Sequence, residues 1–109
     1  MKNKNRKGRG SPLPVSAPAA ERSERVFVVQ DPFRADLQHW VLTEPRLAAR
    51  VLELMDDIKR SPFEGKGKPE RLKHNLQGMW SRRINDEHRL VYEVLPDRIL
   101  FVSARFHYE

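Results

Sequence analysis

The chain has 109 residues, of which 39% are hydrophobic, and it carries 21 lysines and arginines against 15 aspartates and glutamates. This length suits one small domain, and the longest apolar run falls far short of a membrane span. The absence of cysteine excludes a disulfide framework, a thiolate zinc site and a cysteine nucleophile, while the net charge of +6 favours phosphate-bearing or acidic partners.

The N-terminal segment has no apolar periodicity and is rich in lysine, arginine, proline, alanine and serine. Such a segment buries too little apolar surface to offset its ordering entropy. We therefore predict a disordered basic tail at residues 1–24 and one folded domain at residues 25–109. The tail either only aids solubility or acts as an electrostatic arm for RNA. Its prolines interrupt the apolar block that a secretory signal needs, so we expect a cytoplasmic protein.

A short strand and two helices are predicted next. Residues 25–30, RVFVVQ, are β-branched and aromatic, which is typical of a strand. Asp31 offers an N-cap, and apolar side chains recur from Phe33 at i+4, i+7 and i+8, which predicts one apolar helix face. A second helix with the same spacing restarts at Pro45, and Pro62 stops it.

In the last third of the chain the apolar period changes to two, which predicts strands over residues 79–85, 88–94 and 98–106. Before them, residues 61–70 form a loop by their glycine and proline content, followed by one helical turn at 71–75. The order strand, two helices, three strands predicts an α+β fold. We expect the two N-terminal helices to pack on one face of a small antiparallel β-sheet.

The hairpin that begins at residue 79 carries the strongest local signal. If residues 85–87 connect its strands, Arg83 lies opposite Arg89, and like charges directly opposite are destabilising. In one interpretation the acidic residues of the connection neutralise the arginines. In the other, Arg82 or Arg83 forms a phosphate site with Arg89, because guanidinium groups match phosphate oxygens. The pattern alone leaves both open.

The loop that precedes this hairpin is basic and contains glycine. It lacks Walker spacing and no strand leads into it, so nucleotide binding is not expected. It is either a mobile surface segment or a contact for nucleic acid. Glu70 is the acid in this run, and it either forms a weak surface salt bridge or accepts a proton. The basic residues are Lys66, Lys68, Arg71 and Lys73.

The chain ends in RFHYE, and neither His107 nor Tyr108 has an evident place in the core. A lone histidine is usually structural or solvated. With Glu70 and Arg89, however, His107 completes a set that could cleave RNA through its ribose hydroxyl. That set is a base for the 2′-OH proton, a cation for the crowded phosphate and an acid for the leaving 5′-oxygen. No metal is needed, and the four histidines lack metal-ligand spacing.

Residues 61–92, SPFEGKGKPERLKHNLQGMWSRRINDEHRLVY, resemble the signature block of the YoeB/Txe toxins of the RelE/ParE superfamily. The ending RFHYE is similar to the C-terminus of that family, and the resemblance covers residues 26–108. It implies a microbial-ribonuclease-like fold in a bacterial, cytoplasmic protein. The implied protein is the toxin of a type II toxin–antitoxin pair, a metal-independent endoribonuclease (mRNA interferase) without a cofactor. It would cut translated mRNA on the ribosome and so inhibit translation.

The resemblance also implies partners. These are a YefM-like antitoxin, the 70S ribosome and mRNA, a second copy in a homodimer, and operator DNA only through the antitoxin complex; no membrane is implied. By position in the motif, it assigns catalysis to Glu70, Arg89, His107 and Tyr108. It assigns contacts with RNA or the ribosome to Lys73, Arg82 and Arg83, and the loop residues Lys66 and Lys68 are predicted to join them. Two substitutions stand beside these positions, Arg71 for a common proline and Phe106 for a common tyrosine.

In the implied mechanism Glu70 accepts the 2′-OH proton, Arg89 stabilises the phosphate and His107 protonates the leaving oxygen. Tyr108 orients the substrate or the donor. The alternative is a module without catalytic activity that binds RNA or the ribosome and blocks translation sterically. A further alternative, a co-repressor, requires an antitoxin, because the chain has no DNA-reading helix.

Overall fold

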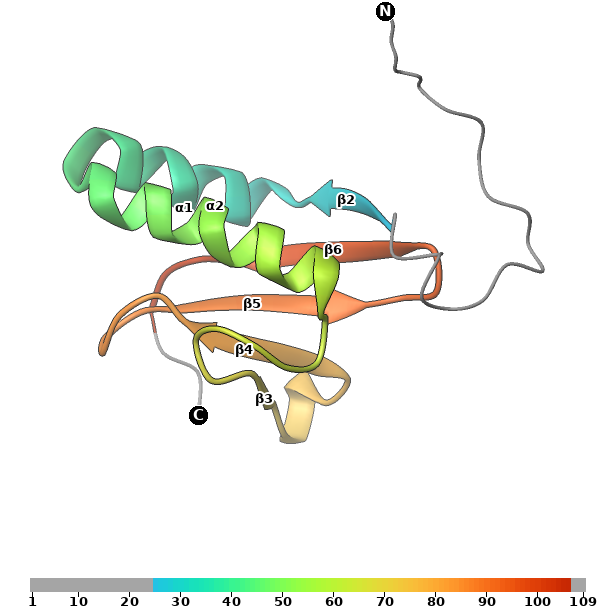
Figure 1. Ribbon diagram of the computed structural model, residues 1–109. Helices are drawn as coiled ribbons and strands as arrows, with labels where there is room; N and C mark the ends of the chain where they lie inside the picture. The colour runs from blue at the N-terminus through green and yellow to red at the C-terminus, as the bar shows by residue number, and fades with distance from the viewer. Residues whose placement is uncertain (1–24, 107–109) are drawn as a thin grey trace, which may run out of the picture.

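Two helices pack on one side of a five-stranded sheet in the computed structural model, which describes residues 25–106 (Figure 1). The predicted tail at residues 1–24 lies outside the described residues. The predicted α+β class is confirmed, and the predicted strand, two helices and three strands occur in that order with one further strand, β3 (Glu70–Arg71), after the helices. No helix of the described part has the length and apolarity needed to cross a membrane. The elements are β2 (Val26–Val29), α1 (Asp31–Thr43), α2 (Pro45–Arg60), β3 (Glu70–Arg71), the 3₁₀ helix η2 (His74–Leu76), β4 (Met79–Arg83), β5 (Arg89–Val94) and β6 (Arg98–Ser103).

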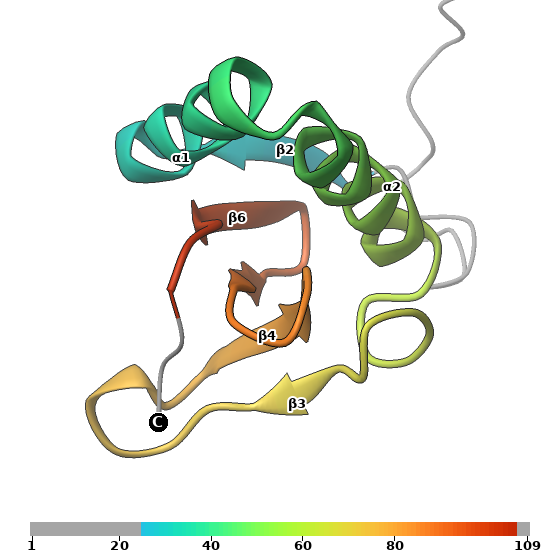
Figure 2. The ribbon, with the colours of Figure 1, turned by 90° about the vertical axis from the view of Figure 1, so that its left-hand side faces the viewer.

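The sheet is mixed, whereas the sequence predicted antiparallel strands throughout. Its order is β2-β6-β5-β4-β3, and β2 pairs in parallel with β6 while all other pairs are antiparallel. The two helices carry the chain away from β2, and such a connection permits parallel pairing. Figure 2 shows the helices wrapped over one side of the curved sheet, with α2 and the segment 104–106 after β6 on opposite sides.

The core fills the space between the helices and the sheet. Phe101 on β6 lies at its centre, with its ring centroid 4.8 Å from that of Phe27 and 5.2 Å from that of Phe33. Trp40 is only 3% exposed, and its indole N–H donates to the carbonyl of Ala104 at 2.8 Å. The helical spacing predicted for α2 matches its buried positions, which are Ala48, Val51, Leu54, Met55 and Ile58.

Three local features differ from the sequence prediction. Asp31 is the first residue of α1, and Gln30 takes the N-cap position without a side-chain cap. The region predicted as a loop contains β3, whose two residues are too few to produce a periodic pattern. The predicted helical turn lies slightly later, as η2, where it forms the connection from β3 to β4. The N–H of Leu72 donates to the carbonyl of Met79 at 2.9 Å and extends this hairpin.

Candidate functional site

The hairpin β4–β5 has the register predicted from sequence, with Arg83 opposite Arg89. The next pair on the same face is Ser81 with Val91, and Glu70 lies opposite Ser81. Paired residues in a sheet share a face, and every second residue along a strand returns to it. Glu70, Arg83 and Arg89 therefore project from one face of the sheet.

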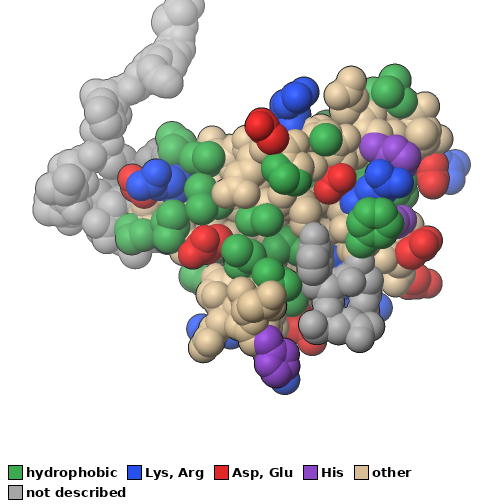
Figure 3. Space-filling model, turned by 180° about the vertical axis from the view of Figure 1, so that it is seen from behind, with side chains coloured by type: hydrophobic (Ala, Val, Ile, Leu, Met, Phe, Trp, Pro, Cys, Tyr) green, Lys and Arg blue, Asp and Glu red, His purple; other side chains and the backbone are tan. Residues whose placement is uncertain are grey.

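This face is the one that the helices leave uncovered. The alternate residues of β4 and β5, among them Leu90 and Tyr92, are buried in the core. We call the uncovered side the open face, and Figure 3 views the molecule from that side. Hydrophobic side chains extend through the middle of this view, and Val26 and Val28 of β2 are 61% and 37% exposed. Glu70 and Arg83 lie toward the other edge of the sheet, on β3 and β4.

Glu70 and Arg83 are exposed, and neither side chain forms an ion pair within residues 25–106. Arg89 is only 8% exposed, and its Nη1 donates to three backbone carbonyls of the hairpin turn. The turn's carboxylates, in the described part of the chain, pair with neither arginine. The carboxylates of the turn therefore do not neutralise the two arginines, and the Arg89 guanidinium is held by backbone carbonyls instead. The acceptors of Arg89 are Asn85, Asp86 and His88, at 2.8, 3.3 and 3.2 Å.

Two hydrogen bonds from the start of β5 clamp the backbone of Phe106. His88 Nδ1 accepts from the Phe106 N–H at 2.8 Å, and the Arg89 N–H donates to the Phe106 carbonyl at 2.9 Å. The His88 ring also packs on Trp40, with centroids 4.7 Å apart. The predicted catalytic residues His107 and Tyr108 follow directly in the chain but lie outside the described residues. The sequence analysis assigned no role to His88, although it stands directly before Arg89 in the signature block.

Arg82 does not lie on the open face. It is fully buried, and its guanidinium forms five hydrogen bonds that hold the loop between α2 and β3. We therefore correct the prediction that Arg82 contacts RNA. Its side chain is enclosed and stabilises the loop that leads to Glu70. Its Nε donates to Tyr92 Oη, Nη1 to Asp57 Oδ2 and the Lys66 carbonyl, and Nη2 to the carbonyls of Ser61 and Glu64, over distances of 2.5 to 3.1 Å.

The same loop is anchored at two further points. Tyr92 Oη donates to the Pro62 carbonyl at 2.7 Å, and the Gly67 carbonyl accepts from the Arg83 N–H at 2.7 Å. Gly67 has φ +79°, and a β-carbon there would lie 3.1 Å from both the Arg83 carbonyl and Leu54. The loop is thus fixed against the end of β4, which positions the following strand β3 and its Glu70 at the sheet edge.

The lysines predicted to contact RNA have different surroundings. Lys66 forms an ion pair with Glu53 of α2, with 3.0 Å between Nζ and Oε2. Lys68 and Lys73 are exposed and form no ion pair in the part of the chain that the structure describes. Of the three lysines predicted to contact RNA, Lys68 and Lys73 are therefore the ones that can bind a phosphate group without breaking an ion pair. Among residues 25–106, no three histidine, aspartate or glutamate side chains gather to hold a metal ion.

The buried network shifts two pKa values. Burial raises the pKa of Tyr92, although the hydrogen bond from Arg82 acts against it. Burial would also raise the pKa of Asp57, but the Lys66 N–H and the Arg82 guanidinium outweigh it and hold the pKa below its usual value. Asp57 is therefore ionised as the counter-charge of Arg82.

We expect this carboxylate to make stability depend on pH. A group whose pKa is lower in the folded state contributes stability above its unfolded pKa, about 3.9 for aspartate, and loses it as the pH falls through the folded pKa. Urea denaturation at a series of pH values should therefore show a shallower acid loss in Asp57→Asn than in the parent. Asp56→Asn, an exposed neighbour on α2, is the control and should keep the parent's slope. Equal slopes for all three proteins would contradict this assignment.

Comparisons with a family model, with related sequences and with solved structures agree with one another. The family model for the YoeB-like toxin of bacterial type II toxin-antitoxin systems matches residues 29–108. Toxin YoeB of Escherichia coli strain K12 is 55% identical over 73 residues, which are 67% of this chain and 87% of that protein. A solved YoeB dimer from Staphylococcus aureus is 38% identical with a TM-score of 0.72, covering 77% of this chain and 98% of that one. A YoeB–YefM complex from the same organism is 37% identical with a TM-score of 0.70, covering 78% and 99%.

Proposed function

Because the chain belongs to the family of YoeB-like toxins of bacterial type II toxin–antitoxin systems, we propose that it is a ribosome-dependent endoribonuclease that cuts translated mRNA. One structural observation supports this proposal in addition to family membership. Glu70, Arg83 and Arg89 share the open face, and the backbone of Arg89 holds Phe106, the residue before His107. We propose that Glu70, the two arginines and His107 act together on one phosphate.

The proposed reaction is a transesterification within the RNA. Glu70 accepts the proton of a 2′-OH, whose oxygen bonds to the adjacent phosphorus while the bond to the 5′-oxygen of the next nucleotide breaks. Arg89 and Arg83 stabilise the charge that develops on the phosphate oxygens. His107 protonates the leaving 5′-oxygen, and Tyr108 orients the substrate. The products are a 2′,3′-cyclic phosphate and a free 5′-hydroxyl, and every proton is handled by side chains without a metal.

The proposed partners follow from the relatives. The Staphylococcus aureus YoeB is solved both as a dimer and with YefM. We infer that a YefM-like antitoxin holds this chain inactive in the bacterial cytoplasm, that two copies form a homodimer, and that operator DNA is bound only through the antitoxin complex. Lys68 and Lys73 would contact the phosphates of the message or of ribosomal RNA, with Lys66 beside them.

Cell-free translation followed by primer extension on the message tests this function. Discrete cuts that appear only on translated message support the endoribonuclease. Inhibition of translation without cuts would instead support a module that blocks the ribosome sterically. A chain that neither cuts nor inhibits would overturn both.

The exposure of Arg83 also predicts how the affinity for ribosomes depends on salt concentration. Its exposed guanidinium has no carboxylate partner in the described region, so we expect it to neutralise one phosphate of the ribosome-bound RNA. Arg83→Gln should reduce the slope of log affinity against log salt concentration by roughly one, measured as binding to programmed ribosomes. Arg98→Gln is the matched control, because Arg98 pairs with Asp97 beside β2, at the other edge of the sheet. An unchanged slope in Arg83→Gln would place this arginine outside the RNA contact.

A further inference from the structure

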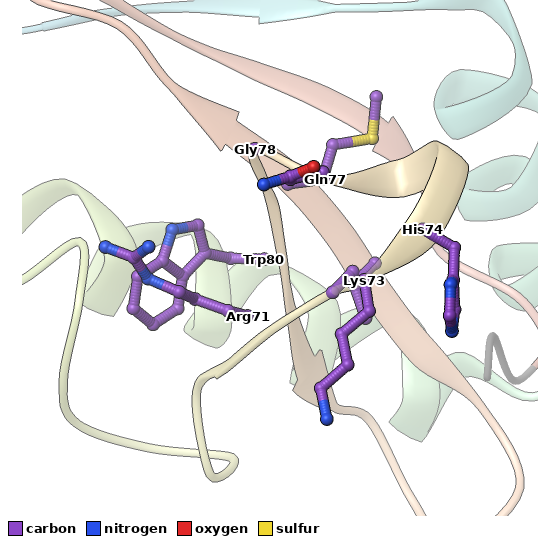
Figure 4. A pocket seen from close by; sticks show the side chains of 8 residues that line it. Arg71, Lys73, His74, Gln77, Gly78 and Trp80 are labelled. Atoms are coloured by element: carbon purple, nitrogen blue, oxygen red, sulfur yellow. The ribbon is translucent and has the colours of Figure 1, made fainter.

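A pocket of about 450 Å³ lies at the connection from β3 to β4. Figure 4 shows Arg71 alongside Trp80 at one end, while Lys73 and His74 project on the other side of the connecting backbone. The Arg71 guanidinium lies 5.4 Å from the centroid of the Trp80 ring. The lining thus combines an aromatic face, a stacked guanidinium and two further basic groups. None of its lining residues belongs to the catalytic set described above, although Lys73 is among the residues proposed to contact RNA phosphates.

The charges of this pocket are uncompensated. Arg71, Lys73 and His74 are exposed, and none of them forms an ion pair within the described range. Trp80 is half-buried, and its ring packs on Phe63 with ring centroids 5.2 Å apart. A partner that fits an aromatic ring stacked with a cation at one end, and further basic groups at the other, is a polyanion that carries flat rings. Single-stranded RNA has that chemistry, because bases stack on aromatic side chains while basic groups follow the phosphates.

The pocket is also continuous with the open face. Side chains alternate along a strand, so Arg71 points away from the face of Glu70, and Leu72 returns to it. Leu72 and Met79 are joined by a backbone hydrogen bond, and both line the pocket. β3 is the last strand of the sheet and has only two residues. An RNA strand that lies on Glu70 therefore reaches the pocket by crossing this short edge.

We infer that the pocket binds a nucleotide that flanks the cleaved bond, with its base against Trp80 and Arg71 and its phosphate near Lys73 and His74. This inference rests on the proposed function, since it places the second nucleotide of the same RNA substrate. It also gives Arg71, which replaces the proline common in the family, a role in holding RNA.

Binding of a 2′-O-methyl hexanucleotide to the full chain tests the pocket, because this RNA analogue lacks the attacking hydroxyl and stays intact. Its affinity is measured by anisotropy of a labelled oligonucleotide, and contact with Trp80 by tryptophan emission. We expect the emission to change on binding in the parent and not in Trp80→Phe, because the other tryptophan, Trp40, is only 3% exposed. Arg71→Gln should weaken binding about tenfold relative to Arg98→Gln, which removes the same charge at the opposite edge.

Several outcomes would contradict the proposal that this pocket binds a nucleotide. These are an oligonucleotide that does not bind the parent, binding without a change in emission, or equal affinities for Arg71→Gln and Arg98→Gln. Displacement of the oligonucleotide by an acidic peptide of equal length and charge, at equal concentration, would assign the surface to a protein partner. Cell-free translation separates this failure from that of the proposed function. A parent chain that cuts translated message while the two arginine variants bind alike retains the function and loses only the pocket.

Discussion

Replacing Arg82 by methionine should lower the free energy of unfolding by about 3–5 kcal/mol, a large share of the roughly 5–15 kcal/mol of a small domain. Methionine matches much of the volume of the arginine stem but supplies no donor. Asp57 would keep its charge without its partner, and the carbonyls that the guanidinium satisfies would lose their donors. Breaking one side of such a network costs far more than replacing all of it by apolar groups.

Arg83→Met is the matched control, because the two arginines are adjacent in β4 and undergo the same chemical change. Arg83 is exposed, and none of its side-chain atoms forms a hydrogen bond or ion pair in the described chain. We expect its stability to stay within about 0.5 kcal/mol of the parent. Chemical denaturation followed by circular dichroism measures both variants. Similar losses for Arg82→Met and Arg83→Met would show that the enclosed network contributes little.

The contrast between these arginines shows what the sequence could and could not predict about the site. The family resemblance implied that both contact RNA or the ribosome, whereas the period of two separates them. Trp80 and Arg82 of β4 alternate with Ile84, the residue after the strand, on one face, and two of these three side chains are apolar. That signal places Arg82 on the core side. Its partner Asp57 lies on a different element, so no local pattern could connect the two.

The fold, too, could be predicted only in part from the sequence. Local periodicity located both helices and the three strands of the meander, because each of them repeats its pattern over several residues. It could not locate β3, which has two residues, nor the parallel pairing of β2 with β6, which joins opposite ends of the domain. The register of Arg83 with Arg89 followed from the length of one turn. Short-range order was thus readable from the sequence, and long-range pairing was not.

Glu70→Gln should reduce the rate of message cleavage by about 10²–10⁴-fold while leaving the fold intact. Glutamine keeps the shape of the side chain and can still hydrogen-bond to a ribose, but it cannot take the 2′-OH proton. Glu70 is exposed on an edge strand and forms no ion pair within residues 25–106, so its loss should change stability by no more than about 0.5 kcal/mol. Glu64→Gln, an exposed acid in the preceding loop, removes the same charge and should cut at nearly the parent's rate.

The decisive measurement is the single-turnover cleavage rate on programmed ribosomes, recorded together with the affinity for those ribosomes. A general base acts on the rate of the chemical step, whereas a residue that only holds RNA acts on affinity. Removing a negative charge beside a polyanion should leave affinity equal or slightly higher. A slow Glu70→Gln variant with undiminished affinity therefore assigns proton transfer to Glu70. A variant that binds weakly but cuts at the parent's rate once bound would assign Glu70 to substrate binding. The base would then have to come from another group at the open face.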